Sequence, residues 1–297
     1  MKDKIVSTEN SGIEEVMIEQ LKLIMQEVIS NKDSNSLQER LKCLISCLQD
    51  YKNQLEKGTF RNSNYCKLLS RYIQLFTSPI VIVGDNKKVI SGSCVFIELK
   101  EKFIITNNHV VQAWKDLQKA GNKVSFQIGS ITIPLESLII DFDRDLDLAT
   151  IKIPIEYEDQ IVYKQDKFFY KPAKWPYNNT TKDDIVTMAG YPGVLREDNN
   201  DFSNIYYASI CESIEDVDKT KGVMVFDRDN WVKSLGLRSP SELDKVGGGF
   251  SGGPVFRFVD GEVELIGIVS ENGGSFFDIM FAFSSYINKD GTIQHYS

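Results

Sequence analysis

The ten residues GGGFSGGPVF, 247–256, place one hydroxyl group, that of Ser251, within a run of glycines and directly before a strand-like run. Glycine lets the backbone take tight turns that other residues resist. The stretch is therefore either an ordinary glycine-rich loop or a strained turn that presents a nucleophile. A nucleophilic serine also needs a base, a group that orients the base and donors for an oxyanion, all from elsewhere in the chain.

Candidates for the base and the orienting group are few. The sequence has only two histidines, and because His295 lies almost at its end, His109 in FIITNNHVV is the obvious base. The run DFDRDLDLATIKI, 141–153, supplies four aspartates. We choose Asp147, which opens the apolar strand-like run, because a carboxylate there can be partly buried against a histidine. Most of the other aspartates in this run are expected to lie in a solvated acidic turn.

The composition is that of an ordinary globular protein of 297 residues, with 42% hydrophobic residues and a formal net charge of -8. An acidic chain argues against nucleic acid or an anionic membrane as the main partner. Its five cysteines form no CxxC pair, so we expect no disulfide framework. Without a signal-peptide pattern or a long apolar run, the chain is expected to be cytoplasmic. No pattern calls for a cofactor or a metal.

Residues 11–76 have the spacing of amphipathic helices. Ser11 with Glu14, and Ser36 with Glu39, form capping-box patterns, and apolar residues follow at steps of three and four. We therefore divide the chain into a helical module, 1–76, and a second domain, 77–297. The module is either a small bundle packed on the second domain or a recruitment or sensing unit.

Short β-rich runs dominate the chain after Pro79, among them KFIIT, LATIKI, IVTMAG and EVELIGIVS. Many short strands with few helices predict a sandwich or a barrel. The longest irregular region is expected at 194–246, with a short helix near Trp231.

His109, Asp147 and Ser251, in this order and with their flanks, resemble the trypsin-like (chymotrypsin-fold) serine proteases, and among these the bacterial Deg/HtrA-like branch. The stretches that carry the resemblance, over about residues 80–290, are SGSCVFIELKEKFIITNNHVV, DRDLDLATIKI, VTMAGYPG, GFSGGPVF and LIGIVSENGG. The resemblance implies a mainly β protein with two six-stranded antiparallel barrels and the triad between them. His109 and Asp147 would come from the first barrel and Ser251 from the second.

The resemblance also implies roles for further residues. The backbone N–H groups of Gly249 and Ser251 would form the oxyanion hole. Lys245 would lie near the base of the primary pocket, where it either favours an acidic side chain or points to solvent. The strand that pairs with the substrate would contain Ser270, Glu271 and Asn272.

The sequence departs from the family pattern at three points. Phe250 replaces the aspartate that digestive proteases pair with a new N-terminus, so that route of activation is not expected. Val110 follows the histidine, so the bridge that Cys94 would make in secreted relatives is absent. The peptide-binding PDZ modules of many Deg-like proteases are also not expected.

The sequence therefore predicts a serine endopeptidase that cleaves protein or peptide substrates through an acyl-enzyme. Its helical module would bind a protein partner and control or recruit the protease. An architectural resemblance points to bacterial signalling or defence proteins. The alternative is a catalytically inactive protease fold that binds peptides or serves as an adaptor.

Overall fold

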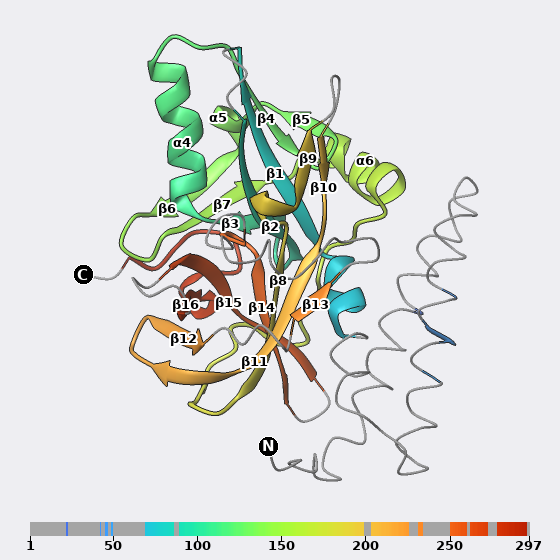
Figure 1. Ribbon diagram of the computed structural model, residues 1–297, viewed down its shortest axis with the longest axis vertical. Coiled ribbons are helices and arrows are strands. Elements are labelled where there is room, and N and C mark those ends of the chain that lie inside the picture. The colour runs from blue at the N-terminus through green and yellow to red at the C-terminus, as the bar shows by residue number, and fades with distance from the viewer. Residues whose placement is uncertain are drawn as a thin grey trace.

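The computed structural model describes residues 69–85, 89–198, 203–225, 231–233, 250–259, 262–272 and 278–295, with isolated positions between 22 and 49. Most strands lie in two antiparallel sheets, one above the other in Figure 1. The chain is mainly β, as expected. Because residues 1–68 fall almost wholly outside these ranges, most of the predicted helical module does too, and the 1–76 and 77–297 division stays a prediction.

The first sheet has seven strands in the order β5-β4-β1-β2-β3-β7-β6. Their bounds are Thr77–Gly84 for β1, Val89–Glu98 for β2, Lys102–Thr106 for β3, Val124–Ile128 for β4, Ile131–Ile133 for β5, Ile139–Asp143 for β6 and Leu148–Lys152 for β7. β-branched and aromatic side chains on these strands, such as Ile82, Phe96 and Ile104, are wholly buried. This sheet has one strand more than the predicted six, and β5 and β6 at its two ends are not hydrogen-bonded to each other.

The second sheet has the order β12-β16-β15-β14-β8-β11-β13, and β12 also pairs with β11. Six strands therefore form a closed ring, as predicted, and β13 is attached to β11. The bounds are Ile185–Gly190 for β8, Ala208–Val217 for β11, Lys221–Val225 for β12, Trp231–Lys233 for β13, Pro254–Val259 for β14, Glu262–Asn272 for β15 and Asp278–Phe283 for β16. A separate ribbon pairs β9, Arg196–Asp198, with β10, Ser203–Ile205.

Trp231–Lys233 itself is strand β13 and pairs with Ala208 to Ile210 at one edge of β11. The edge forms only when the sheet folds, so the local sequence does not predict the strand. The residues on either side of β13 lie outside the described ranges, so the helix expected near Trp231 stays a prediction. Helix α4, Asn108–Lys119, was not expected from the sequence and packs Val110, Val111, Trp114 and Leu117 onto the first sheet. Helices α5, Leu135–Leu138, and α6, Ile155–Gln165, lie beside the same sheet (Figure 1).

Residues 69–76 form part of the core of the second domain. Residues 69–74 are helical, and Leu69, Tyr72, Ile73 and Phe76 are buried in the cluster that fills the second sheet and extends to β2 and β3 of the first. The Tyr207 hydroxyl donates to the Ser70 carbonyl at 2.7 Å. Residues 69–76, which the predicted division assigns to the helical module, therefore contribute to the core of the β domain.

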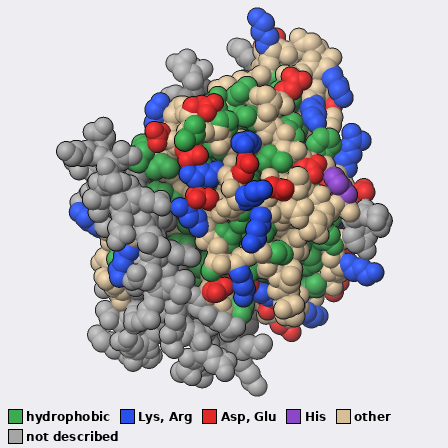
Figure 2. Space-filling view, turned by 180° about the vertical axis from the view of Figure 1, so that it is seen from behind, with side chains coloured by type: hydrophobic (Ala, Val, Ile, Leu, Met, Phe, Trp, Pro, Cys, Tyr) green, Lys and Arg blue, Asp and Glu red, His purple; other side chains and the backbone are tan. Residues whose placement is uncertain are grey.

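On the face shown in Figure 2, basic and acidic side chains lie next to one another. Partly exposed pairs of this kind include Lys102 with Glu98 at 3.8 Å and Lys171 with Glu98 at 3.3 Å. Such pairs contribute little to stability. Within the described ranges, no helix has the length and apolar character needed to span a bilayer.

Candidate active site

The Asp147 carboxylate contacts His109 twice. Its Oδ2 lies 2.7 Å from Nδ1 of the imidazole, and its Oδ1 accepts the His109 backbone N–H at 2.9 Å. A carboxylate can only accept hydrogen bonds, so Nδ1 is the donor and Nε2 is the basic nitrogen. The His109 side chain is 35% exposed and that of Asp147 is 19% exposed. The imidazole is therefore oriented and accessible to a substrate.

Local chain geometry explains both positions. His109 lies in the first turn of α4, where backbone N–H groups lack partners within the helix. The N-cap residue Asn107 makes no side-chain cap, and the first turn contains no acidic residue. Asp147 supplies both a cap and a negative charge at the helix N-terminus, which stabilises the helix. The Asn107 amide in turn donates to the Asp147 carbonyl at 2.7 Å.

Asp147 does not open strand β7, which begins at Leu148. It is the last residue of the four-residue loop 144–147 between β6 and β7, and its φ is 54°. Aspartate tolerates this left-handed conformation better than most residues do. The loop therefore directs the carboxylate away from the sheet and toward the start of α4.

Ser251 lies in the turn between Phe250 and strand β14. Gly252 has a φ of 86°, and a methyl group there would overlap the carbonyl oxygen of Ser93. The Gly252 N–H donates to the Val269 carbonyl at 2.9 Å, and the Gly253 N–H donates to the Phe250 carbonyl at 2.7 Å. Among the described residues, the Ser251 N–H donates no hydrogen bond. The turn is thus held by backbone hydrogen bonds of Gly252 and Gly253.

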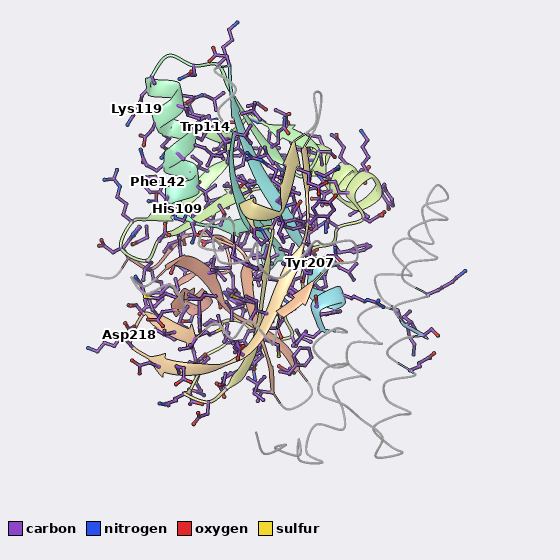
Figure 3. The ribbon with its side chains drawn as sticks, in the orientation of Figure 1. His109, Trp114, Lys119, Phe142, Tyr207 and Asp218 are labelled. Carbon is purple, nitrogen blue, oxygen red and sulfur yellow. The ribbon has the colours of Figure 1, made fainter. Side chains whose placement is uncertain are left out.

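The two halves of the site meet at strand β2. The Ser93 N–H donates to the Ser251 carbonyl at 2.8 Å. A methyl group at Gly92 would lie 2.9 Å from Cγ2 of Val110 and 3.5 Å from the Ser251 carbonyl oxygen. The first turn of α4 and the Ser251 turn therefore both lie against Gly92. Figure 3 shows His109 at the end of α4 nearest the second sheet, with Lys119 at the far end.

The sequence matches the family model described as a trypsin-like peptidase domain over residues 92–268, which include His109, Asp147 and Ser251. The chain belongs to the trypsin-like peptidase family. No curated protein matches this peptidase.

Several solved structures match the chain at low sequence identity. An inactive serine-to-alanine form of Rv3671c from M. tuberculosis H37Rv is 16% identical and has a TM-score of 0.38. The match covers 71% of this chain and 83% of that one. The thermostable serine protease AL20 from an extremophilic microorganism is 10% identical, with a TM-score of 0.41 and coverage of 70% and 90%. HL collagenase is 19% identical, with a TM-score of 0.44 and coverage of 71% and 89%.

The residues predicted to bind the substrate are only partly described. Lys245 and the oxyanion residue Gly249 lie outside the described ranges. Ser270, Glu271 and Asn272 are in β15, but the side chains of the last two are not among those described. Ser270 is buried, and its Oγ has no hydrogen-bond partner among the described residues. It follows Val269, whose backbone is hydrogen-bonded to Gly252 and Gly253 of the Ser251 turn.

Two departures from the family pattern can be followed in the structure. Phe250 is 4% exposed and packs against Gly190, so this position offers no carboxylate to an N-terminal amine. Cys94 is a buried thiol whose Sγ lies 3.5 Å from the Ser78 carbonyl oxygen. Burial raises the pKa of the Cys94 thiol well above its ordinary value, so it remains protonated and unreactive.

Sequence reasoning did not identify three residues that support the site. Asn107 binds the Asp147 carbonyl, and Thr106 donates through Oγ1 to the Ser93 carbonyl at 2.8 Å. The Ser93 hydroxyl accepts the Tyr191 N–H, also at 2.8 Å. Only the polar character of the runs TNNH and SGS signalled them in the sequence.

Proposed function

We propose that this peptidase is an active serine endopeptidase with His109, Asp147 and Ser251 as its triad. The observation that carries the proposal is the pair of contacts from one carboxylate to His109, 2.7 Å to Nδ1 and 2.9 Å to the backbone N–H. An ion pair with a purely structural role would not require an imidazole that is held in one orientation near a glycine turn that carries a serine. A base that must accept a proton at Nε2 does require it.

In the proposed mechanism, Nε2 of His109 accepts the proton of the Ser251 hydroxyl as Oγ attacks the carbonyl carbon of the scissile peptide. The N–H groups of Gly249 and Ser251 stabilise the oxyanion. His109 then donates the proton to the leaving amine as the peptide bond breaks, and an acyl-enzyme remains. Water, activated by the same imidazole, hydrolyses the acyl ester and regenerates the serine.

The substrate-binding residues remain those that the family resemblance implies. Ser270, Glu271 and Asn272 would pair with the substrate backbone along β15. Lys245 would favour an acidic side chain before the scissile bond.

Control by the N-terminal module is also part of the proposal. Ile45 packs against the core cluster of the second sheet, which also contains Leu69 and Tyr72. Residues 69–76 join this cluster to the segment before them. A protein partner that binds the module would therefore act on the barrel through residues 69–76 rather than on the triad directly.

A fluorophosphonate probe tests the central proposal, because it modifies an activated serine and ignores an ordinary one. The full-length protein is expected to react at Ser251, located by mass spectrometry, and the Ser251→Ala and His109→Ala variants are not. Ser137→Ala, which removes an exposed hydroxyl that donates to the Pro134 carbonyl, is the matched control and is expected to react normally. No reaction in the folded wild type would favour the inactive, peptide-binding alternative.

A further inference from the structure

The second histidine, His295, makes a carboxylate contact of its own. Its Nδ1 lies 2.7 Å from Oδ2 of Asp143, and its Nε2 lies 3.5 Å from Oδ2 of Asp141. Both aspartates come from β6, the strand that leads into the loop carrying Asp147. The three residues thus connect the segment 287–295 to the hairpin that supplies the orienting carboxylate of the proposed triad.

Asp143 acts within that hairpin. It pairs with Leu148 across the loop 144–147. Its Oδ1 accepts the backbone N–H of Asp145 at 2.8 Å and of Leu146 at 2.9 Å. An aspartate that bonds the backbone in this way holds the loop in one conformation. Since Asp147 is the next residue after Leu146, the conformation held by Asp143 sets the direction of the Asp147 side chain.

The segment that carries His295 also contacts the hairpin through its backbone. The Ile293 N–H donates to Oδ2 of Asp141 at 2.9 Å, and Oγ1 of Thr150 donates to the Gly291 carbonyl at 2.6 Å. Thr150 lies in β7 and Asp141 in β6, so the segment binds both strands of the hairpin. His295 reaches Asp143, the carboxylate nearest to the loop.

Burial and charge agree with this arrangement. Asp143 is 7% exposed. Although burial alone favours the neutral acid, the Leu146 N–H and His295 together keep the pKa of Asp143 below its usual value. The carboxylate is therefore charged near neutral pH. Its Oδ1 accepts hydrogen bonds from the loop backbone, and its Oδ2 is hydrogen-bonded to the His295 imidazole. Neither oxygen contacts His109, so any influence on the proposed triad passes through Asp147.

We propose that Asp143 and His295 are positioning residues that hold the loop 144–147 so that the Asp147 carboxylate faces His109. The catalytic consequence rests on the proposed function, but the positioning itself does not. Loss of the clamp is expected to let the loop move, which weakens the contact between Asp147 and Nδ1 of His109. Misplacing a catalytic group by about 1 Å can lower turnover by about 100-fold.

The first test observes His109 directly and needs no activity. Because the chain has only two histidines, the imidazole ¹⁵N spectrum of the full-length protein contains two sets of signals, and His295→Ala removes one. The exchange of the His109 Nδ1 proton with water is expected to become faster in His295→Ala and in Asp143→Asn. His295→Gln, a milder change, is expected to give an intermediate rate. Exchange that stays at the wild-type rate in all three folded variants overturns the proposal.

Gln294→Ala is the matched control, because the Gln294 amide lies in the same segment but bonds Asn288 at 2.9 Å rather than the hairpin. It is expected to leave His109 exchange and turnover unchanged. If it changes His109 exchange as much as His295→Ala does, the segment has only a general structural role and the proposal is wrong.

The second test measures catalysis. His295→Ala is expected to lower kcat about 10- to 100-fold with little change in KM, since the proposed effect acts on His109 through Asp147. In an Asp147→Asn background the same change should have no further effect, because two residues that act through one group are not additive. A full additional loss there overturns the proposal. If wild type has no activity but His109 exchange responds as expected, the proposed function fails and the positioning role stands.

Discussion

Ser93 donates its backbone N–H to the carbonyl oxygen of Ser251 over 2.8 Å. Ser93 lies in β2 of the first sheet, and Ser251 lies in the turn that enters β14 of the second. This hydrogen bond joins the two sheets at the residue proposed as the nucleophile. The distance between Ser251 and His109 therefore depends on β2, which neither residue belongs to.

Ser93→Ala is expected to reduce the free energy of unfolding by about 1–3 kcal/mol. The change keeps the bond to Ser251 but removes the hydroxyl that accepts the buried Tyr191 N–H at 2.8 Å. Urea unfolding measures the difference. The exposed serine variant Ser137→Ala should stay within about 0.5 kcal/mol of wild type. Equal effects at the two positions would show that the Ser93 hydroxyl has no special role.

Gly252→Ala is expected to abolish fluorophosphonate labelling. The new methyl group would overlap the Ser93 carbonyl, so the turn must change its shape. Gly121→Ala is the control, because Gly121 also has a positive φ, 82°, but has no atom within 4 Å of the added methyl group. It should cost about 1–2 kcal/mol of stability and leave labelling intact. Normal labelling of Gly252→Ala would contradict the required shape of the turn.

Asp147→Asn is expected to lower kcat about 10⁴-fold, because the amide no longer stabilises the imidazolium and selects the wrong tautomer. The variant should also lose some stability, since the carboxylate caps α4 through the His109 N–H. Asp145→Asn changes an exposed carboxylate of the same loop and should retain activity. If Asp145→Asn were inactive and Asp147→Asn active, the assignment of the orienting residue would be wrong.

The contact between His295 and Asp143 is expected to make stability depend on pH. The hydrogen bond to Asp143 raises the pKa of His295, so its contribution is complete below about pH 6.5 and is lost as the pH rises through the raised pKa. The pKa of Asp143 is lowered, so its contribution is complete above about pH 3.9 and is lost as the pH falls through the lowered pKa. Asp141 is the other charged group that faces His295.

The difference in melting temperature between wild type and His295→Ala should therefore be largest between about pH 4 and about pH 6.5. Thermal melts over a series of buffers at constant ionic strength measure it. Gln294→Ala should show no such window. A difference that is constant across the series would mean that the contact does not depend on the charge of His295.

Two truncations separate the core function of residues 69–76 from the proposed regulatory function of the preceding segment. A fragment starting at residue 77 loses Tyr72, Ile73 and Phe76, each buried and costing about 2–5 kcal/mol to remove, so it should unfold or aggregate. A fragment starting at residue 69 should remain folded and show altered peptide cleavage. Equal melting temperatures of the two fragments would contradict the core function of residues 69–76.

The sequence by itself was sufficient for features that depend on neighbouring residues. Runs such as KFIIT and IVTMAG correspond to β3 and β8 residue for residue, because β-branched side chains favour strands locally. The SGG run predicted the turn at Ser251, since glycine adopts a positive φ more readily than other residues do. With only two histidines in the chain, His109 and Asp147 could be paired from their flanking patterns alone, and they are in contact in the structure.

Features that depend on residues far apart in the chain were decided only by the tertiary structure. The N-terminus of helix α4 is capped by Asp147, which lies 38 residues after His109, the residue whose N–H it accepts. The segment Trp231–Lys233 is a strand because the edge of β11 supplies its hydrogen bonds. His295 binds Asp143 across 152 positions, and no local pattern connects the two. Such contacts form only when folding brings an unpaired donor or a carboxylate close to its partner. They therefore cannot be predicted from the spacing of residues in the sequence.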